Sequence, residues 1–244
     1  MPTALEVARK ATNELAQTGR VIFATNTDLL QDNLSHELGR PLKLMPLPVL
    51  WPDDDVKNIL PETGVVFGFY GGLRIEKGSR ILAEAILRFV DRYSDTKFIV
   101  QAPYKDTDEI ALRQLSVNPK IEIIRTNFKT KNEYFMQFCR SHVILLPYNP
   151  SDYRGRTSTV FIEALGLGRR VITTDATWMA HQLRRRPAAG LIMASYSAGA
   201  LYDCLEAARD AVMTGSSDIE FDRKIISDNS ASAFCSTLVQ AMSD

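Results

Sequence analysis

The sequence predicts an α/β fold, a doubly wound parallel sheet of Rossmann-like topology with helices on both faces. Two observations lead to this prediction. From residue 65 onward, short apolar runs alternate with amphipathic segments of helical period. The apolar runs are also nearly continuous in Val, Ile and Leu, as in strands that are covered on both faces. Because crossovers between parallel strands are right-handed, ligands are expected at the carboxyl ends of the strands.

The elements expected before residue 65 are fewer and less regular. Residues 3–17 repeat apolar side chains at helical spacing, and residues 20–26 form an apolar run typical of a strand. Residues 27–39 begin with N-cap residues and end at a glycine, as a helix does, and 42–50 are extended and punctuated by prolines. The polar, proline-bounded segment 51–64 is interpreted as the main boundary of the chain.

After this boundary, strands and helices alternate without a break. Strands are expected over 65–70, 97–103, 121–127, 143–149, 171–174 and 190–195, and helices over 78–93, 106–117, 131–142, 157–166, 177–185 and 197–213. The tail, 221–243, also has a helical pattern. No internal repeat or low-complexity segment interrupts this order.

The composition argues against several classes of protein. Lys+Arg and Asp+Glu both number 29 among 244 residues, so the net charge is zero and nothing favours a general nucleic-acid binder. No apolar run is long enough to span a bilayer, and the N-terminal residues do not resemble a signal peptide. The three cysteines lie far apart without metal-binding spacing, which suits a reducing cytoplasm. We therefore expect a cytoplasmic protein that does not bind nucleic acid.

The turn "GFYGGLRIEKGSR" is the first candidate binding element. Gly71 and Gly72 follow a strand, where glycine lets the backbone approach a ligand closely. Arg74 and Lys77 stand just before a helix, whose N-terminus favours an anion. The pattern is neither GxGxxG nor a Walker A loop. The spacing alone leaves two alternatives, a clamp for a diphosphate and a tight turn with solvated charges.

The segment "PYNPSDYRGRTSTVFIEALGLG" is the second candidate. A polar loop containing Arg156 leads into a helix whose first residues, Thr157, Ser158 and Thr159, offer hydroxyls and free N–H groups to an anion. Glu163 follows one to two turns inside this helix, between apolar neighbours. The alternative, an exposed surface glutamate, fits these neighbours poorly. A carboxylate in such surroundings requires a partner.

These two segments together resemble the C-terminal half of GT-B glycosyltransferases, particularly family 4, the glycosyl transferases group 1. The resemblance rests on "GGLRIEKG" followed much later by "PYNPSDYRGRTSTVFIEALGLGRRVITTD", and it spans roughly residues 20 to the end. The positions that match the motifs of the family are Lys77, Gly78, Glu163, Ala164, Gly168, Val171 and Ile172.

The resemblance implies a role for each candidate residue. Glu163 would hold the ribose hydroxyls of a nucleotide sugar, and residues 157–159, with Gly71, Gly72 and Arg156, would line the substrate site. Arg74 and Lys77 would be catalytic, because they would neutralise the diphosphate as the bond to the sugar breaks. The family needs no metal ion for this, and no Asp-x-Asp signature stands in the two segments. We therefore expect no metal and no cofactor.

The sequence departs from the family pattern at two positions. Gly155 stands eight residues before Glu163, where the family has a first glutamate that faces the transferred sugar, and Asp152 is only a weak substitute. Gly72 occupies the place of an arginine in the first turn, and Arg74 is expected to serve instead. A GT-B enzyme also has two Rossmann-like domains, whereas this length holds one such domain and part of another.

The predicted organisation follows from that difference in length. We expect a remnant of an N-terminal Rossmann-like domain over 1–50, a linker over 51–64, a nucleotide-sugar-binding domain over 65–220 and a helical tail over 221–244. The predicted function is donor binding for a retaining glycosyltransferase that modifies a glycan or lipid-linked acceptor in surface polysaccharide synthesis. The alternative is a non-catalytic nucleotide-sugar-binding module that acts with a partner chain. A sugar-nucleotide epimerase is a third and weaker alternative.

Overall fold

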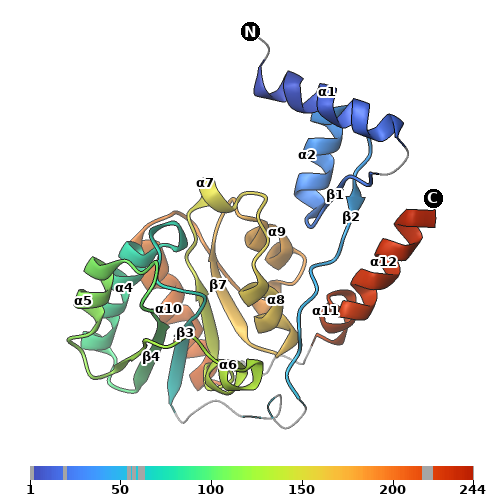
Figure 1. Ribbon diagram of the computed structural model, residues 1–244. Coiled ribbons are helices and arrows are strands. Elements are labelled where there is room, and N and C mark those ends of the chain that lie inside the picture. Colours follow the sequence, from blue (N-terminus) through green and yellow to red (C-terminus); the bar gives the residue numbers. More distant parts are fainter. Residues whose placement is uncertain are drawn as a thin grey trace.

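The main body is a single parallel sheet. The computed structural model describes residues 3–18, 21–53, 56, 59, 64–215 and 222–243. Six parallel strands lie in the order β5-β4-β3-β6-β7-β8 (Figure 1). They are β3 (Val65–Phe69), β4 (Thr96–Gln101), β5 (Ile121–Ile124), β6 (Val143–Leu146), β7 (Arg170–Thr174) and β8 (Gly190–Met193). The predicted α/β class and doubly wound parallel sheet are therefore confirmed.

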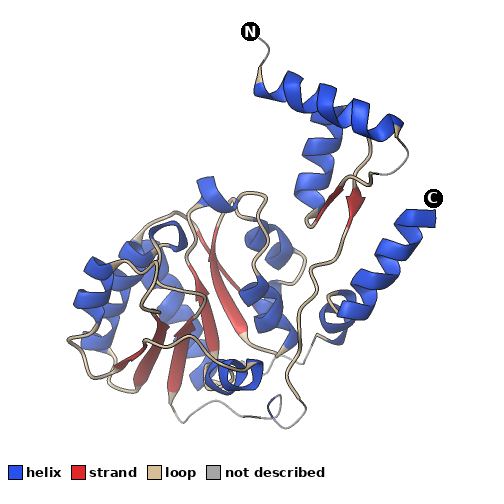
Figure 2. Ribbon diagram, viewed as in Figure 1, coloured by secondary structure: helices blue, strands red, loops and turns tan. Residues whose placement is uncertain are grey.

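Helices cover both faces of this sheet. On one face lie α4 (Ser79–Arg92), α5 (Glu109–Leu115) and α10 (Ala198–Met213). On the other face lie α6 (Lys131–Phe138), α8 (Thr159–Gly166) and α9 (Trp178–Arg184) (Figures 1 and 2). Every residue of β3 and β6 is buried, which is why these segments read as unbroken apolar runs in the sequence.

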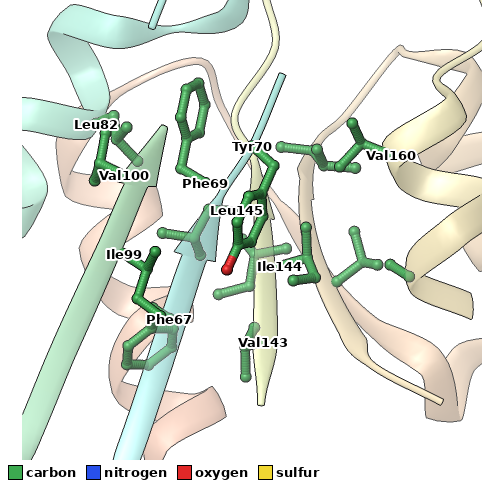
Figure 3. Packing of buried hydrophobic residues seen from close by; sticks show 14 of the residues in the cluster. Phe67, Phe69, Tyr70, Leu82, Ile99, Val100, Val143, Ile144, Leu145 and Val160 are labelled. Carbon is green, nitrogen blue, oxygen red and sulfur yellow. The ribbon is translucent and has the colours of Figure 1, made fainter. Parts of the chain in front are cut away.

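Aromatic side chains fill the core between β3, β4 and α4. Phe67 stacks on Phe98 with ring centroids 5.1 Å apart, and Phe89 from α4 meets Phe67 edge-on at 5.8 Å. Figure 3 shows how Phe67, Phe69 and Tyr70 leave the β3 chain toward Ile99, Val100 and Leu145 on the neighbouring strands. Burial of such rings is the largest source of stability in a core of this kind.

The strand order reverses between β3 and β6. Strands β3, β4 and β5 are added in one direction, and β6, β7 and β8 in the other. The two neighbours at the reversal are far apart in the chain, and their register pairs Phe67 with Val143 and Gly68 with Ile144. The connections that leave β3 and β6 turn to opposite faces of the sheet, so a crevice is expected at the carboxyl ends of these two strands.

The N-terminal residues form a smaller unit beside this edge. Helix α1 (Ala4–Gln17) and helix α2 (Asp28–Leu38) pack beside a short parallel pair, β1 (Ala24–Thr25) and β2 (Lys43–Leu44) (Figure 1). Thr27 caps α2 and Gly39 ends it in the left-handed conformation, as its sequence predicts. Residue 20 of the strand expected over 20–26 lies outside the described residues, and among 21–26 the strand consists of Ala24 and Thr25, which pair with Lys43 and Leu44.

Some short elements were not anticipated. The 3-10 turn η1 (Ile75–Lys77) and helix α7 (Pro150–Tyr153) form where loops are expected, and η2 (Pro187–Ala189) precedes β8. The helical tail consists of two helices, α11 (Arg223–Asp228) and α12 (Ala231–Ser243). Much of the linker expected over 51–64, namely 54, 55, 57, 58 and 60–63, lies outside the described residues, as do 221 and 244 of the tail.

Candidate functional site

The turn after β3 forms one side of the candidate site. Gly71 and Gly72 both have positive φ angles, 86° and 90°, which residues with a side chain rarely adopt. The Gly71 N–H donates to the Gln101 side chain at 2.7 Å, which fixes the turn to the end of β4. A Cβ atom at Gly71 would lie 2.6 Å from the Lys77 ammonium nitrogen and 3.4 Å from Val160. The positive φ therefore favours glycine at this position, and a side chain there would also displace the Lys77 ammonium group.

Lys77 is buried at the end of η1 and reaches back over the turn. Its ammonium group donates to the Gly71 carbonyl oxygen and lies 5.4 Å from the centre of the Tyr148 ring. Burial, together with the positive charges of Arg74 and Arg156, lowers the pKa of Lys77 to about 8, against the opposing effect of Glu76 and Glu163. Arg74 itself is half-buried and pairs with Glu76 at 3.1 Å. Two cationic side chains thus converge on the glycine turn.

The loop after β6 forms the opposite side. Helix α8 begins at Thr159, and the Ser158 hydroxyl caps it by accepting from the Phe161 N–H at 3.3 Å. The first N–H groups of this helix, at Thr159 and Val160, have no intrahelical acceptor and carry the positive end of the helix dipole. The guanidinium carbon of Arg156 lies 4.6 Å from the centre of the Tyr153 ring. This side therefore also favours an anion.

Glu163 lies one turn inside α8 and is mostly buried. The Tyr134 hydroxyl on α6 donates to its Oε2 atom at 2.7 Å. Burial raises the pKa of Glu163 to about 7, and the hydrogen bond from Tyr134 and the charges of Lys131 and Lys77 limit the rise. The carboxylate expected from the sequence is therefore in a hydrophobic environment, with a phenol as its partner.

Lys77 and Glu163 lie close enough to influence the ionisation of each other. They come from η1 after β3 and from α8 after β6, the two strands at the reversal of the sheet order. Backbone contacts join the same two sides, because the Asn149 N–H donates to the Glu76 carbonyl at 3.0 Å. The result is a cationic side beside a partly buried carboxylate, at the strand ends where the reversal of the sheet order predicts a crevice. Such a site can bind a ligand that has both an anionic group and hydroxyl donors.

Not all predicted residues meet at this point. Gly71, Gly72, Arg74, Lys77, Arg156, Ser158 and Glu163 belong to the two sides described above. Thr157 instead accepts a hydrogen bond from Asn26 of the N-terminal unit at 3.2 Å, and the side chain of Thr159 is exposed.

The N-terminal unit touches the loop after β6 directly. The Thr27 hydroxyl donates to the Gly155 carbonyl at 3.0 Å. A Cβ atom at Gly155 would lie 2.8 Å from Leu30, so α2 fills the space that a side chain at position 155 needs. Asp28 accepts hydrogen bonds from Trp178 and Arg185 on α9 and its C-cap at 3.3 and 3.0 Å. The loop is therefore held from outside the six-stranded body.

A cavity of about 480 Å³ lies on the other side of the loop. Its walls come from the N-terminal unit, α8, α9, α11 and α12, and include Met45, Phe161, Trp178 and Ile225. Thr157 is the one predicted site residue among those that line it. Ionisable residues line this cavity too, among them Asp28 and Arg185. The convergence of Lys77 and Glu163 defines the candidate site instead, because burial shifts the pKa of both of these groups toward neutrality.

Two aromatic residues of the site were missed by sequence reasoning. Tyr134 and Tyr148 stand in runs that read as an ordinary helix and an ordinary strand end. Tyr148 lies at the end of the strand predicted over 143–149, two residues beyond the observed end of β6 at Leu146, and this position at a carboxyl end is the one signal that could have identified it. Tyr134 offered no such signal, because its contact with Glu163 depends on the packing of α6 against α8.

Among the described residues, no group of three His, Cys, Asp or Glu side chains is arranged to hold a metal ion. None of the described helices combines the length and the hydrophobicity that a membrane span requires.

Comparisons with known proteins identify the family of this chain. A model of the family described as glycosyl transferases group 1 matches residues 64–210, more than half of the chain. A comparison with curated proteins finds no match.

Three solved structures share the fold. A glycosyltransferase from Rickettsia africae ESF-5 superposes with a TM-score of 0.76 at 13% identity, over 99% of this chain and 67% of that one. Sucrose-phosphate synthase from Thermosynechococcus elongatus superposes with a TM-score of 0.64 at 13% identity, over 90% of this chain and 56% of that one. TarM superposes with a TM-score of 0.67 at 13% identity, over 92% of this chain and 43% of that one. At this identity the likeness concerns the fold alone, and the chain spans only part of each protein.

Proposed function

Because the chain belongs to the glycosyl transferases group 1 family, we propose that it binds the nucleotide-sugar donor of a retaining glycosyltransferase. The observation that supports this most directly is the convergence of Lys77 and Glu163 beside the Gly71 turn. A nucleoside diphosphate has two anionic phosphates next to a ribose with two hydroxyl donors. A cationic turn beside a carboxylate matches that arrangement of charge and hydrogen-bonding groups.

In this proposal the diphosphate lies between the two sides of the crevice. Lys77 and Arg74 approach it from the turn after β3, and the free N–H groups at the start of α8 approach it from the loop after β6. When the bond between the sugar and the phosphate breaks, negative charge grows on the leaving diphosphate. Fixed cations and helix dipoles in a partly buried site stabilise that charge. No metal ion is needed for this step, and activity should therefore persist in the presence of a chelator.

Glu163 holds the ribose in this proposal. Its carboxylate accepts hydrogen bonds from the ribose hydroxyls, and this gives a role to an acid that stands among apolar neighbours in α8. The acceptor is a glycan or a lipid-linked glycan of surface polysaccharide synthesis in the cytoplasm. Residues 65–220 form the donor domain, and 1–50 belong to a second Rossmann-like domain that contributes to the acceptor side.

A second candidate function is a non-catalytic nucleotide-sugar-binding module that acts with a partner chain. Gly155 favours it, because glycine offers no carboxylate where the family has its first, sugar-facing glutamate, and Leu30 of α2 packs against this position. Transfer of sugar from a labelled donor to an acceptor, by this protein alone and with a candidate partner, separates the two functions. Turnover by the protein alone would exclude the non-catalytic alternative.

Calorimetric titration with UDP, GDP, ADP and dTDP tests the donor site itself. We expect one of these to bind, and Glu163→Gln to weaken that nucleotide about tenfold. The reason is that hydrogen bonds to a charged group contribute roughly 1.5–3 kcal/mol, and about 1.4 kcal/mol is a factor of ten. The amide still accepts from Tyr134, so the melting temperature should change little.

Glu206→Gln is a matched control for this experiment. Glu206 also accepts from a tyrosine hydroxyl, that of Tyr93 at 2.6 Å, but it lies on α10, away from the crevice. Its substitution should leave nucleotide affinity unchanged. Equal affinity of the parent and the Glu163→Gln variant would remove Glu163 from the site.

A further inference from the structure

The hydrogen bond between Tyr134 and Glu163 is a contact within the protein that the proposed binding of the nucleotide does not itself require. The phenol donates to Oε2 of the carboxylate at 2.7 Å. Within the described residues, no hydrogen bond to the other oxygen, Oε1, is formed. One oxygen of Glu163 is therefore occupied by the protein, and the other is available.

The position of the Tyr134 ring is fixed from several sides. It meets Tyr70 edge-on at 6.0 Å, and the rings of Phe128, Phe135 and Phe138 lie within 5.6 Å of it. A ring held by four others has little freedom to rotate its hydroxyl away. The phenol also stays protonated, because burial raises the pKa of Tyr134 well above its usual value. It is therefore a permanent donor at one fixed place.

We propose that Tyr134 is a positioning residue, which holds Oε2 of Glu163 so that Oε1 faces the ribose hydroxyls of the nucleotide. The inference rests on the proposed function and adds a residue to that site. Without the phenol the carboxylate can rotate, and ordering it again on binding costs entropy. A preorganised acceptor binds more tightly than one that must first be ordered.

The phenol also determines whether Glu163 is charged. The charged groups that face this carboxylate are Lys131 on α6 and Lys77 on η1, and the neutral phenols are Tyr134 and Tyr148. The hydrogen bond from Tyr134 lowers the pKa of Glu163 toward its value of about 7. Tyr134→Phe removes this effect, so the remaining burial raises the pKa further. The carboxylate form, which accepts from ribose, is then lost at a higher pH than in the parent.

The experiment compares a ribonucleoside diphosphate with its 2′,3′-dideoxy counterpart. The nucleotide is the one among UDP, GDP, ADP and dTDP that the parent binds best, taken in its ribose form. In the parent we expect about a tenfold preference for ribose, which weakens as the pH falls through about 7. In Tyr134→Phe the preference for ribose should fall to about threefold at pH 7. As the pH is lowered, this preference should also begin to weaken at a higher pH than in the parent. Affinity for the dideoxy form should stay the same.

Tyr93→Phe is the control for removal of a phenol. Tyr93 donates to Glu206 at 2.6 Å, so the substitution removes the same kind of hydrogen bond elsewhere in the protein. Ribose preference and its pH profile should match the parent. A Tyr134→Phe variant that has a lower melting temperature but keeps the ribose preference and the pH profile of the parent would overturn the inference and leave a structural role for Tyr134.

The double variant Tyr134→Phe/Glu163→Gln keeps the inference testable if the single variant does not fold. It removes both partners of the hydrogen bond, so no charged group is left buried without its donor. We expect it to bind the ribonucleotide as Glu163→Gln does, because Tyr134 acts through Glu163. A further independent loss of affinity would overturn the inference. A parent protein that binds none of the four nucleotides would overturn the proposed function, and this inference with it.

Discussion

The two sides of the crevice are built in different ways. The turn 71–78 after β3 is shaped by its backbone, with three glycines of positive φ and a 3-10 turn. The loop 147–159 after β6 is shaped by side chains: Asn149 and Ser158 cap the short helices α7 and α8. The first side depends on residues of the six-stranded body. The second is held in addition by α2 of the N-terminal unit, through Thr27 and Leu30.

This difference indicates which changes each side tolerates. A glycine turn packed against backbone atoms has almost no adjustable part, so a substitution there costs stability. Side-chain caps and contacts with a separate unit can be weakened one at a time, so a substitution there changes order and affinity more than folding. Substitutions on each side, compared with matched substitutions elsewhere in the protein, test this contrast.

Gly78→Ala should have the largest effect. Gly78 has a φ of 78°, and a Cβ atom there would lie 2.0 Å from the carbonyl oxygen of Pro147. We expect a loss of about 3 kcal/mol or more in the free energy of unfolding, measured with urea, because the left-handed conformation and the backbone collision both cost energy. Gly199→Ala in α10 is the control: no atom lies within 4 Å of its Cβ position, and alanine favours a helix. Equal stability of the two variants would refute the rigidity of the turn.

Lys77→Met should weaken the binding of a nucleoside diphosphate about a hundredfold, since charge-assisted hydrogen bonds contribute roughly 1.5–3 kcal/mol. Stability should not fall at pH 7, because a buried charge is removed. The folded pKa of about 8 lies below the ordinary 10.5, so the unfolded chain binds more protons between these values. The parent should therefore gain stability as the pH rises from about 8 to 10.5, and the variant should not.

Lys120→Met is the control for the loss of a lysine that binds carbonyl groups. Its ammonium group donates to the Val90 carbonyl at 2.9 Å, outside the crevice. Nucleotide affinity should be unchanged. If Lys120→Met weakened binding as much as Lys77→Met does, the loss could not be assigned to the glycine turn.

Asp28→Ala should have the smallest effect on binding, about threefold or less. Asp28 joins α2 to α9 through Trp178 and Arg185, so its loss loosens the unit that holds the loop after β6. Hydrogen exchange should become faster in α2 and around 155–158, and remain unchanged in 71–78. Asp95→Ala removes a comparable pair with Arg209 at 2.6 Å, away from the crevice, and serves as control. Faster exchange at the glycine turn would contradict the independence of the two sides.

The sheet was predictable because its strands are buried on both faces. Runs such as Val65–Phe69, Val143–Leu146 and Gly190–Met193 have no polar side chain, which is typical of strands inside a parallel sheet. The short elements were not predictable to the same degree. η1 and α7 each have three or four residues, too few for a periodic signal, and β1 and β2 owe their two residues each to a single local pairing.

The residues of the site also differ in how far the sequence could predict them. Glycines and charges beside a strand end predict an anion-binding turn, so Lys77 could be named. Glu163 could be named because it is an acid among apolar neighbours and matches the family motif, although the use of both residues by a ligand stays a prediction. The partner of Glu163 could not be named, because Tyr134 reaches it from a different helix. The contact of Leu30 with Gly155 also depends on how a separate unit packs, which no local pattern encodes.

The reversal of the strand order has a consequence for how the protein folds. β3 and β6 pair through residues as distant as Phe67 and Val143, whereas the other neighbouring strands in the sheet follow one another directly in the order of the chain. Closing such a long loop is entropically costly, so this pairing is expected to form late on the folding pathway. The crevice opens at this seam and cannot exist before it closes. A ligand that bridges Lys77 and Glu163 therefore binds only the fully assembled chain, and it would slow unfolding by tying together the contacts that are the last to form.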